Sequence, residues 1–298
     1  YLPGRMLEAG LIARADDPST PVRHGAPRPS VAIVGDDTLR LLRDGYLWGT
    51  RGFERAGGGD AFRTRVMGRR VLVLRGADAA RFFYEDGRFR RGPGAVPMSI
   101  AHLLQDEGSV QTLEGERHRV RKRLFLDLVW GADARAGVTD AVLAAWDELA
   151  LAREGRPVRL FDHAAEALTA GTVAAVGIPD PVDTEAVTAE LVSMVENAGR
   201  VGPPNWIARG RRLATEERAR EWIRAARDAG DSTTPLGRIA HHVEDGELLD
   251  ERVAGVELLN VLRPATAAAH YLVFAAWALH HRPELAERMT ASDEFRAA

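Results

Sequence analysis

The chain has 298 residues, of which 45% are hydrophobic and 28% charged, a composition typical of a globular protein rather than a disordered one. A net charge of −3 and a pI near 6.4 give no overall electrostatic case for binding nucleic acid or an anionic membrane, so neither partner is expected. The absence of cysteine excludes disulfides, thiolate metal sites and thiol nucleophiles within these residues, and it suits a cytoplasmic location.

The N-terminal part mixes Gly, Pro, Arg and Asp without periodicity. We expect an N-terminal extension over residues 1–29 and one domain over residues 30–298. Within this domain a short helix is predicted over residues 38–44, closed by Gly45. Two runs, 62–66 and 71–74, flank a Met-Gly-Arg-Arg turn and predict a two-stranded hairpin, which is the one clear strand signal.

Helical periodicity dominates the rest of the chain, with Gly155, Gly177, Gly230 and Pro179 as stop signals. The fold class is therefore mainly α, a multi-helical domain with a small β-sheet. The most apolar run, residues 265–279, is too short and too polar to span a membrane. The predicted helices cover residues 77–84, 116–128, 133–154, 160–176, 184–198, 206–229, 236–243 and 250–281.

The last of these, a long central helix over residues 250–282, must cross the whole domain, so its middle is expected to be interior. Arg263 and Pro264 stand in that middle. A proline inside a helix costs roughly 3 kcal/mol, and a buried guanidinium costs several kcal/mol more unless an anion meets it. Two adjacent residues that are each unfavourable inside an apolar helix indicate a functional site. The simplest such site is a pocket that binds a carboxylate.

A second cluster opens the helix predicted at 116–128, where five cations and a histidine follow Gly115. His118 and Lys122 are four residues apart and share a face. The cluster is either a solvated basic face or a pair that meets an acidic cofactor group such as a propionate or phosphate. The apolar end of the helix, and the lack of an acid between Glu116 and Asp127, favour the cofactor. Nucleic-acid binding is disfavoured because no aromatic residues interleave with the charges.

The stretch Glu-Leu-Leu-Asn-Val-Leu-Arg-Pro at 257–264, followed by Tyr-Leu-Val-Phe at 271–274, resembles the bacterial fatty-acid peroxygenase branch of the cytochrome P450 superfamily. The Asn-Val-Leu-Arg-Pro part is specific, because most cytochromes P450 carry a Gly-x-x-Thr or acid-Thr motif there to deliver protons. The resemblance covers residues 36–298 in order. Further matches are Asp44-Gly45-Tyr46-Leu47, Phe83-Tyr84, Arg88-Phe89, Gly115, His118, Arg121-Lys122, Leu124-Phe125 and Val201-Gly202-Pro203 with Trp206.

This resemblance implies a cytochrome P450-like fold that holds haem b, with its iron, between helices. It implies that Arg263 binds the carboxylate of a fatty acid, and that this carboxylate replaces the missing acid–alcohol pair as the general acid–base group. Asn260 would orient Arg263, and Pro264 would kink the helix over the haem. His118 and Lys122 match positions that bind the haem propionates.

Gln111 matches a position near the haem where members of the family that favour decarboxylation carry histidine. A neutral amide cannot change its protonation state near pH 7, so hydroxylation is predicted to dominate over decarboxylation.

The implied function is hydrogen-peroxide-dependent hydroxylation of a long-chain fatty acid near its carboxylate, with decarboxylation as a second outcome and no redox partner required. Two alternatives stay open. One is a cytochrome P450 monooxygenase fed by redox partners, which the missing Gly-x-x-Thr motif disfavours. The other is a non-catalytic helical protein that binds lipid or haem.

The sequence departs from the family pattern at the haem iron. The family's ligand is a cysteine in a Phe-x-x-Gly-x-x-x-Cys-x-Gly loop, preceded by a Glu-x-x-Arg helix, and these 298 residues contain neither. They therefore supply no metal ligand. Because all the preceding matches keep their order, we expect the sequence to belong to a longer, complete enzyme; the alternative is a fragment that cannot perform the chemistry.

Overall fold

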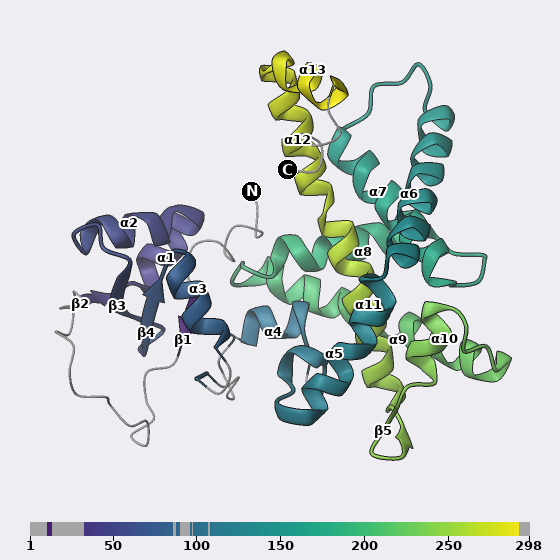
Figure 1. Ribbon diagram of the computed structural model, residues 1–298, viewed down its shortest axis with the longest axis horizontal. Coiled ribbons are helices and arrows are strands. Elements are labelled where there is room, and N and C mark those ends of the chain that lie inside the picture. The colour runs from purple at the N-terminus through teal and green to yellow at the C-terminus, as the bar shows by residue number, and fades with distance from the viewer. Residues whose placement is uncertain are drawn as a thin grey trace. The chain divides into compact units, whose positions relative to one another are not determined.

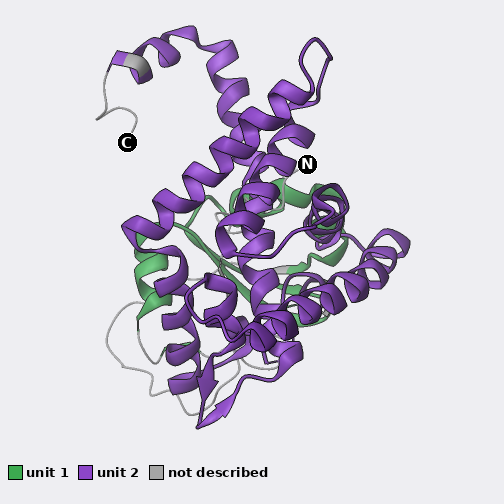
Figure 2. Ribbon diagram, turned by 90° about the vertical axis from the view of Figure 1, so that its right-hand side faces the viewer, with its two compact units in different colours: residues 1–98 green, residues 99–298 purple. Residues whose placement is uncertain are grey.

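The computed structural model of the chain describes residues 11–13, 33–85, 88, 89, 96, 98–106 and 108–291 (Figure 1). The chain forms two compact units, residues 1–98 and 99–298, shown in two colours in Figure 2. Most of the predicted extension, residues 1–29, lies outside the described residues. Its separation from a single domain over residues 30–298 stays a prediction.

The first unit contains a four-stranded sheet in the order β1-β4-β3-β2, formed by β1 (Leu11–Ala13), β2 (Ile33–Asp36), β3 (Ala61–Val66) and β4 (Arg69–Leu74). The antiparallel β3–β4 pair confirms the predicted hairpin. The edge strands β1, antiparallel to β4, and β2, parallel to β3, were not predicted, because three or four residues are too few to show a strand period.

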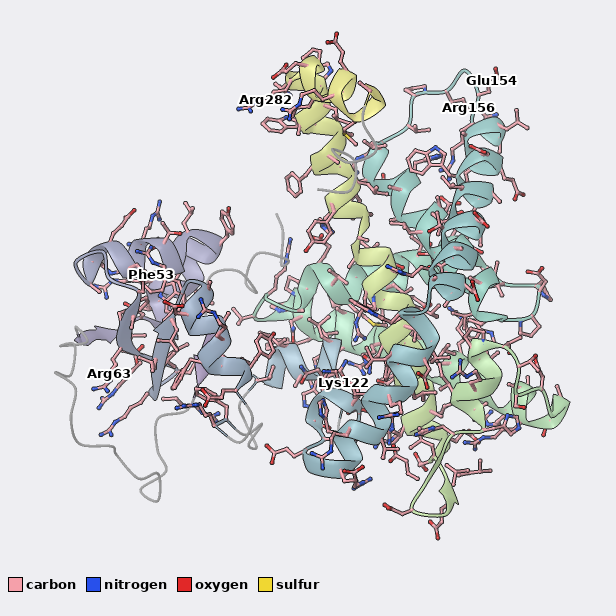
Figure 3. The ribbon with its side chains drawn as sticks, in the orientation of Figure 1. Phe53, Arg63, Lys122, Glu154, Arg156 and Arg282 are labelled. Atoms are coloured by element: carbon pink, nitrogen blue, oxygen red, sulfur yellow. The ribbon has the colours of Figure 1, made fainter. Side chains whose placement is uncertain are left out.

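Helices α1 (Thr38–Asp44), α2 (Trp48–Arg55) and α3 (Ala77–Tyr84) complete this unit, with a 3₁₀ turn η2 (Gly45–Leu47) between the first two. The bounds of α1 and α3 are those predicted. Helix α2 was not predicted, because its glycines weaken helix propensity. Gly52 is required by packing: a Cβ there would lie 2.3 Å from Cζ of Phe62, which is fully buried beside Trp48 and Phe53. Of these residues, Phe53 is labelled in Figure 3.

The second unit is helical, as predicted, except for one small hairpin. The helix predicted over 236–243 ends at Ala240 in the structure, not at Val243. The Asp245-Gly246 pair, with φ of 53° and 84°, forms a tight turn between the strands β5 (Val243–Glu244) and β6 (Glu247–Leu248). The elements are α4 (Met98–Leu104), η3 (Val110–Thr112), α5 (Gly115–Val129), α6 (Ala132–Ala152), α7 (Leu160–Val176), α8 (Thr184–Asn197), α9 (Pro203–Ala229), α10 (Pro235–Ala240), β5 (Val243–Glu244), β6 (Glu247–Leu248), α11 (Glu251–Ala267), α12 (Ala269–His281) and α13 (Pro283–Ala291).

Helix α11 is the centre of this unit and packs against α7, α8, α9 and α10. Its apolar residues Ala254, Leu258, Leu259 and Leu262 are at most 1% exposed and belong to the largest hydrophobic cluster. The prediction that the middle of this helix is interior is therefore confirmed.

The predicted single helix over 250–282 is wrong in one respect, because it breaks at Ala268 into α11 and α12. Pro264 has no N–H to donate to the carbonyl one turn earlier, and its ring crowds that carbonyl. The next turn tightens: the N–H of Ala268 is shared between the carbonyls of Pro264 (3.2 Å) and Ala265 (3.0 Å). None of the helices in the described ranges combines the length and the hydropathy needed to cross a membrane.

Candidate functional site

Arg263 lies on α11 with only 4% of its surface exposed. Its Nη2 donates hydrogen bonds to the backbone carbonyl of Leu104 and, at 2.6 Å, to Oδ1 of Asn260. Its Nη1 is buried and has no hydrogen-bond acceptor among the described residues. A buried guanidinium nitrogen without an acceptor is costly, and an anionic ligand would supply the missing partner.

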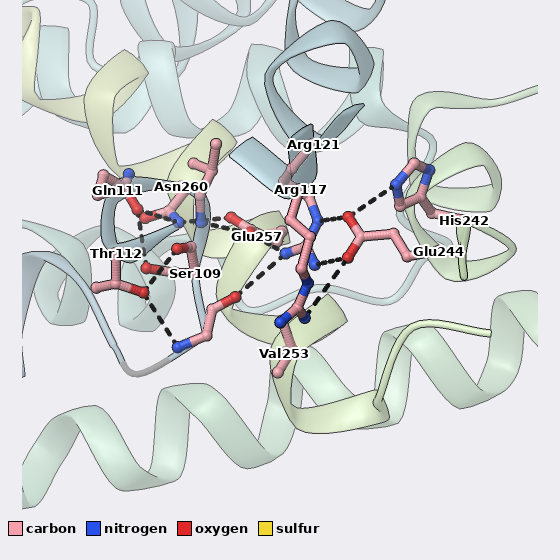
Figure 4. A network of polar contacts seen from close by, with 12 residues as sticks. Ser109, Gln111, Thr112, Arg117, Arg121, His242, Glu244, Val253, Glu257 and Asn260 are labelled. Atoms are coloured by element: carbon pink, nitrogen blue, oxygen red, sulfur yellow. Dashed lines mark hydrogen bonds and ion pairs between the residues drawn. The ribbon is translucent and has the colours of Figure 1, made fainter. Parts of the chain in front are cut away.

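Asn260 joins Arg263 to Gln111, so the structure brings three of the predicted site residues together; Figure 4 shows two of them, Asn260 and Gln111. The Asn260 amide nitrogen donates to Oε1 of Gln111 at 3.1 Å and to Oε2 of Glu257 at 2.8 Å. Gln111 lies in η3, where the hydroxyl of Ser109 donates to the same Oε1 at 2.9 Å. The side chain of Asn260 is thereby fixed with its oxygen toward Arg263.

Pro264 is exposed on α11, directly after the buried Arg263. Its effect on the site therefore acts through the backbone, by leaving the carbonyl of Asn260 without the usual helical donor and by tightening the turn at Ala268.

The network continues into residues that the sequence analysis did not assign (Figure 4). Arg121 on α5 is fully buried, and its Nη1 donates at 2.5 Å to Oε1 of Glu257. Its Nε and Nη2 make a bidentate pair with Glu244 of β5 at 2.5 and 2.7 Å. The N–H of Val110 also donates to Glu257, at 2.8 Å, and His242 lies 3.3 Å from Glu244.

The surroundings of Glu257 and Glu244 shift the pKa values of these two acids in opposite directions. Burial raises the pKa of Glu257, and this outweighs the hydrogen bond from Asn260 and the charge of Arg121. Burial also disfavours ionisation of Glu244, but the hydrogen bonds and charge of Arg121 outweigh it and bring the pKa of Glu244 below its usual value. Glu244 is therefore the more strongly ionised partner of Arg121.

Glu257 could have been found from the sequence, since it is the one acid of α11 beyond the first-turn Glu251 and lies among apolar residues of the same helix as Arg263. Arg121 is among the positions that match the family, but the sequence gives it no role and no partner. Nothing local distinguishes it from the other cations of α5, because the acids that pair with it lie 123 and 136 positions further along the chain.

A second buried arginine, Arg212 on α9, was also missed. It is 2% exposed; its Nε donates to Glu216 at 2.6 Å, whereas its Nη1 and Nη2 have no acceptor among the described residues. Burial, together with the charge of Arg212, lowers the pKa of Arg263 to about 9, against the opposing charges of Glu257 and Glu216. Arg263 thus stays protonated near pH 7.

His118 and Lys122 lie one turn apart on α5. His118 is half-buried, and Lys122, which is labelled in Figure 3, is exposed. Of the neighbouring cations, Arg119 pairs with Glu116 at 2.6 Å and Arg121 enters the buried network. An imidazole and an ammonium on one face fit the two carboxylates of a haem in donor chemistry. No three His, Asp or Glu side chains gather into a metal site in the part of the chain that the structure describes.

No family model matches the sequence. Among solved structures, a mutant form of cytochrome P450SP alpha (CYP152B1) is 34% identical with a TM-score of 0.77, and the match covers 82% of this chain and 61% of that one. Cytochrome P450EX alpha (CYP152N1) with myristic acid is 30% identical with a TM-score of 0.80, covering 87% and 64%. A cytochrome P450 OleT variant in complex with arachidonic acid is 23% identical with a TM-score of 0.82, covering 89% and 65%. The chain thus spans between 61% and 65% of the length of these three structures.

Proposed function

Because the chain belongs to the cytochrome P450 superfamily, in the CYP152 family of the structures that it matches, we propose that the whole protein is a hydrogen-peroxide-dependent hydroxylase of long-chain fatty acids. It acts near the carboxylate, with decarboxylation as a minor outcome. Myristic acid in the P450EX alpha structure supports a fatty acid as substrate.

The observation that carries this proposal is the free Nη1 of Arg263. The nitrogen is buried beside an otherwise paired Nη2, so a carboxylate oxygen that reaches it gains a charge-assisted hydrogen bond in a site with little water. Arg263 holds the fatty acid in its ionised form. The second carboxylate oxygen is then available to accept a proton from hydrogen peroxide.

Asn260 and Gln111 are positioning residues in this proposal. The oxygen of Asn260 accepts from Nη2 of Arg263 and thereby turns Nη1 toward the ligand. Gln111 holds the amide of Asn260 in that orientation. Pro264 shapes the backbone at the site.

The cofactor is haem b. When it is bound, its iron supplies the activation of hydrogen peroxide, and the cysteine thiolate that the family places on the iron comes from outside these 298 residues. His118 and Lys122 hold its propionates. We also propose a cytoplasmic protein that needs no redox partner, since peroxide delivers both the oxygen and the electrons.

The test is turnover of myristic acid by the purified, haem-containing protein with hydrogen peroxide and no reductase. Wild type should form a hydroxylated acid. Arg263→Gln should lose roughly a hundredfold or more in turnover, since it removes one partner of a buried charge pair, while keeping its haem spectrum. Arg211→Gln is the matched control, because Arg211 is an exposed arginine on α9.

Two results would contradict the proposal. Near-normal turnover by Arg263→Gln would remove its carboxylate-binding role. Activity that requires NADPH and a reductase instead of peroxide would identify a conventional monooxygenase.

A further inference from the structure

Helices α9 and α11 run antiparallel with a fixed register. At one end of the contact, Nε of Arg224 bonds to Oε1 of Glu251 at 2.6 Å. One turn further, Gly255 allows the backbones to approach: a Cβ there would lie 3.3 Å from the backbone nitrogen of Arg220. About two turns further on each helix, the same register brings Arg212 opposite Arg263.

This register places two buried positive charges, Arg212 and Arg263, in the contact between α9 and α11, which we call the seam. Arg212 and Arg263 are 2% and 4% exposed, and the electrostatic effect of Arg212 on Arg263 is consistent with their lying close together. The charged groups that act on Arg263 there are Arg212, Glu216 and Glu257. Glu216 pairs with Arg212 and Glu257 pairs with Arg121, so among the described residues neither acid forms an ion pair with Arg263.

The donors in the seam are also unsatisfied. Among the described residues, four buried side-chain nitrogen or oxygen atoms lack a hydrogen-bond partner, and three of them are Nη1 and Nη2 of Arg212 and Nη1 of Arg263. Buried donors in folded proteins are nearly always satisfied, so such a concentration indicates a missing acceptor. We expect this acceptor to be anionic, because Arg212 has Glu216 as its counter-charge whereas a neutral acceptor would leave the buried charge of Arg263 without one.

We propose that Arg212 is a second anion-binding residue and that one carboxylate group binds between Arg212 and Arg263. A carboxylate has two oxygens and about four lone-pair directions, enough to accept from both guanidinium groups. With a fatty acid as the ligand, this inference rests on the proposed function. It adds a specificity rule: the site selects a fully charged head group over an uncharged one of the same chain length.

The experiment compares myristic acid with 1-tetradecanol, which has the same chain but no charge. Calorimetric titration of the purified full-length protein measures both affinities without using turnover. Arg212→Gln should weaken myristate binding about tenfold or more and change 1-tetradecanol binding less than about twofold. The matched control is Arg211→Gln, at the neighbouring exposed arginine of the same helix, which should change neither.

A conservative variant covers the case in which Arg212→Gln does not fold, as judged by circular dichroism. Arg212→Lys keeps the charge but replaces two terminal nitrogens by one, and it should weaken myristate binding about threefold to tenfold. Unchanged myristate affinity in a folded Arg212 variant overturns the inference.

The outcomes separate this inference from the proposed function. Loss of myristate binding in Arg263→Gln but not in Arg212→Gln overturns the two-arginine site and leaves the function intact. If wild type does not bind myristate, butyrate is titrated instead. If both variants lose butyrate binding, the two-arginine site is supported although the fatty-acid function has failed. If Arg212→Gln still binds butyrate, or if wild type does not bind it, the two-arginine site is overturned.

Discussion

At the scale of single residues, the site is built from buried charges whose partners come from distant parts of the chain. Arg121 donates hydrogen bonds to the carboxylates of Glu244 and Glu257. The side chain of Asn260 links Glu257 to Arg263. Glu257 is thereby shared between Arg121, which it neutralises, and Asn260, which it orients. A change at one of these residues is therefore expected to affect the others, so their effects should not be additive.

The ion pair of Glu244 provides a pH-dependent prediction. The folded-state pKa of Glu244 lies below its ordinary value, so the pair stabilises the fold above pH 4.5 and this contribution disappears as the pH falls through the lowered pKa. Glu244→Gln should lose about 2–4 kcal/mol of unfolding free energy at pH 7. Urea denaturation between pH 3 and 7 measures it, with the exposed Glu247→Gln as control. A deficit that does not shrink at low pH would contradict this account.

Gln111 provides a prediction about product choice. Its amide accepts from Asn260 and Ser109 and has no proton to exchange near pH 7. Wild type should therefore form mainly hydroxylated acid from myristic acid and peroxide, and Gln111→His should raise the share of terminal alkene. Product analysis by mass spectrometry decides this. A majority of alkene from the unmodified enzyme would show that Gln111 does not have this role.

At the scale of elements, two glycines in helix interiors test how tightly the helices pack. A Cβ on Gly171 of α7 would lie 2.4 Å from Cα of Val142 on α6, a backbone clash that only a shift of the helices can relieve. Gly171→Ala should destabilise the protein by about 1–3 kcal/mol. Gly210→Ala on α9 meets nothing within 4 Å and should stabilise it by about 0.5–1 kcal/mol through helix propensity. Thermal melts that rank the two variants the other way would refute this packing.

Element bounds were predictable where a local signal ends the helix. Helix α7 has both predicted ends, and its stop, Gly177, has the left-handed φ of 85° that favours glycine. Helix α2 and the break at Ala268 were missed for different reasons. Packing on Phe62 overrides the weak propensity of α2. The effect of Pro264 appears one turn beyond the proline itself.

The site was predictable in part for the same reason. Arg263 conflicts with its apolar helix and can be found from the sequence, and the resemblance added Asn260 and Gln111. Arg121, Glu244 and Arg212 lie in charged segments that are typical of exposed helices and turns. Only tertiary packing buries the two arginines and leaves the Glu244 side chain 8% exposed. A charged residue among apolar neighbours in the sequence can be found from the sequence. A charged residue that has polar neighbours in the sequence but is buried by distant segments cannot.

At the scale of the whole molecule, the second unit contains every residue assigned to the candidate site, from Gln111 to Pro264. The family resemblance and the local electrostatics each indicate Arg263, since its donor without an acceptor among the described residues is a property of this chain.

Lys122 is the only lysine in these 298 residues; the other 39 of the 40 lysine and arginine residues are arginines. It is exposed on α5, so an amine-directed acylating reagent can modify a single side chain of these 298 residues, and a lysine-specific protease can cut them at a single bond. In the whole protein, which we propose supplies its haem cysteine from outside these residues, peptide mapping measures the rate of acylation at Lys122 without any engineered label. If Lys122 holds a propionate, loading with haem should slow that rate at least severalfold, whereas equal rates with and without haem would remove Lys122 from the cofactor site.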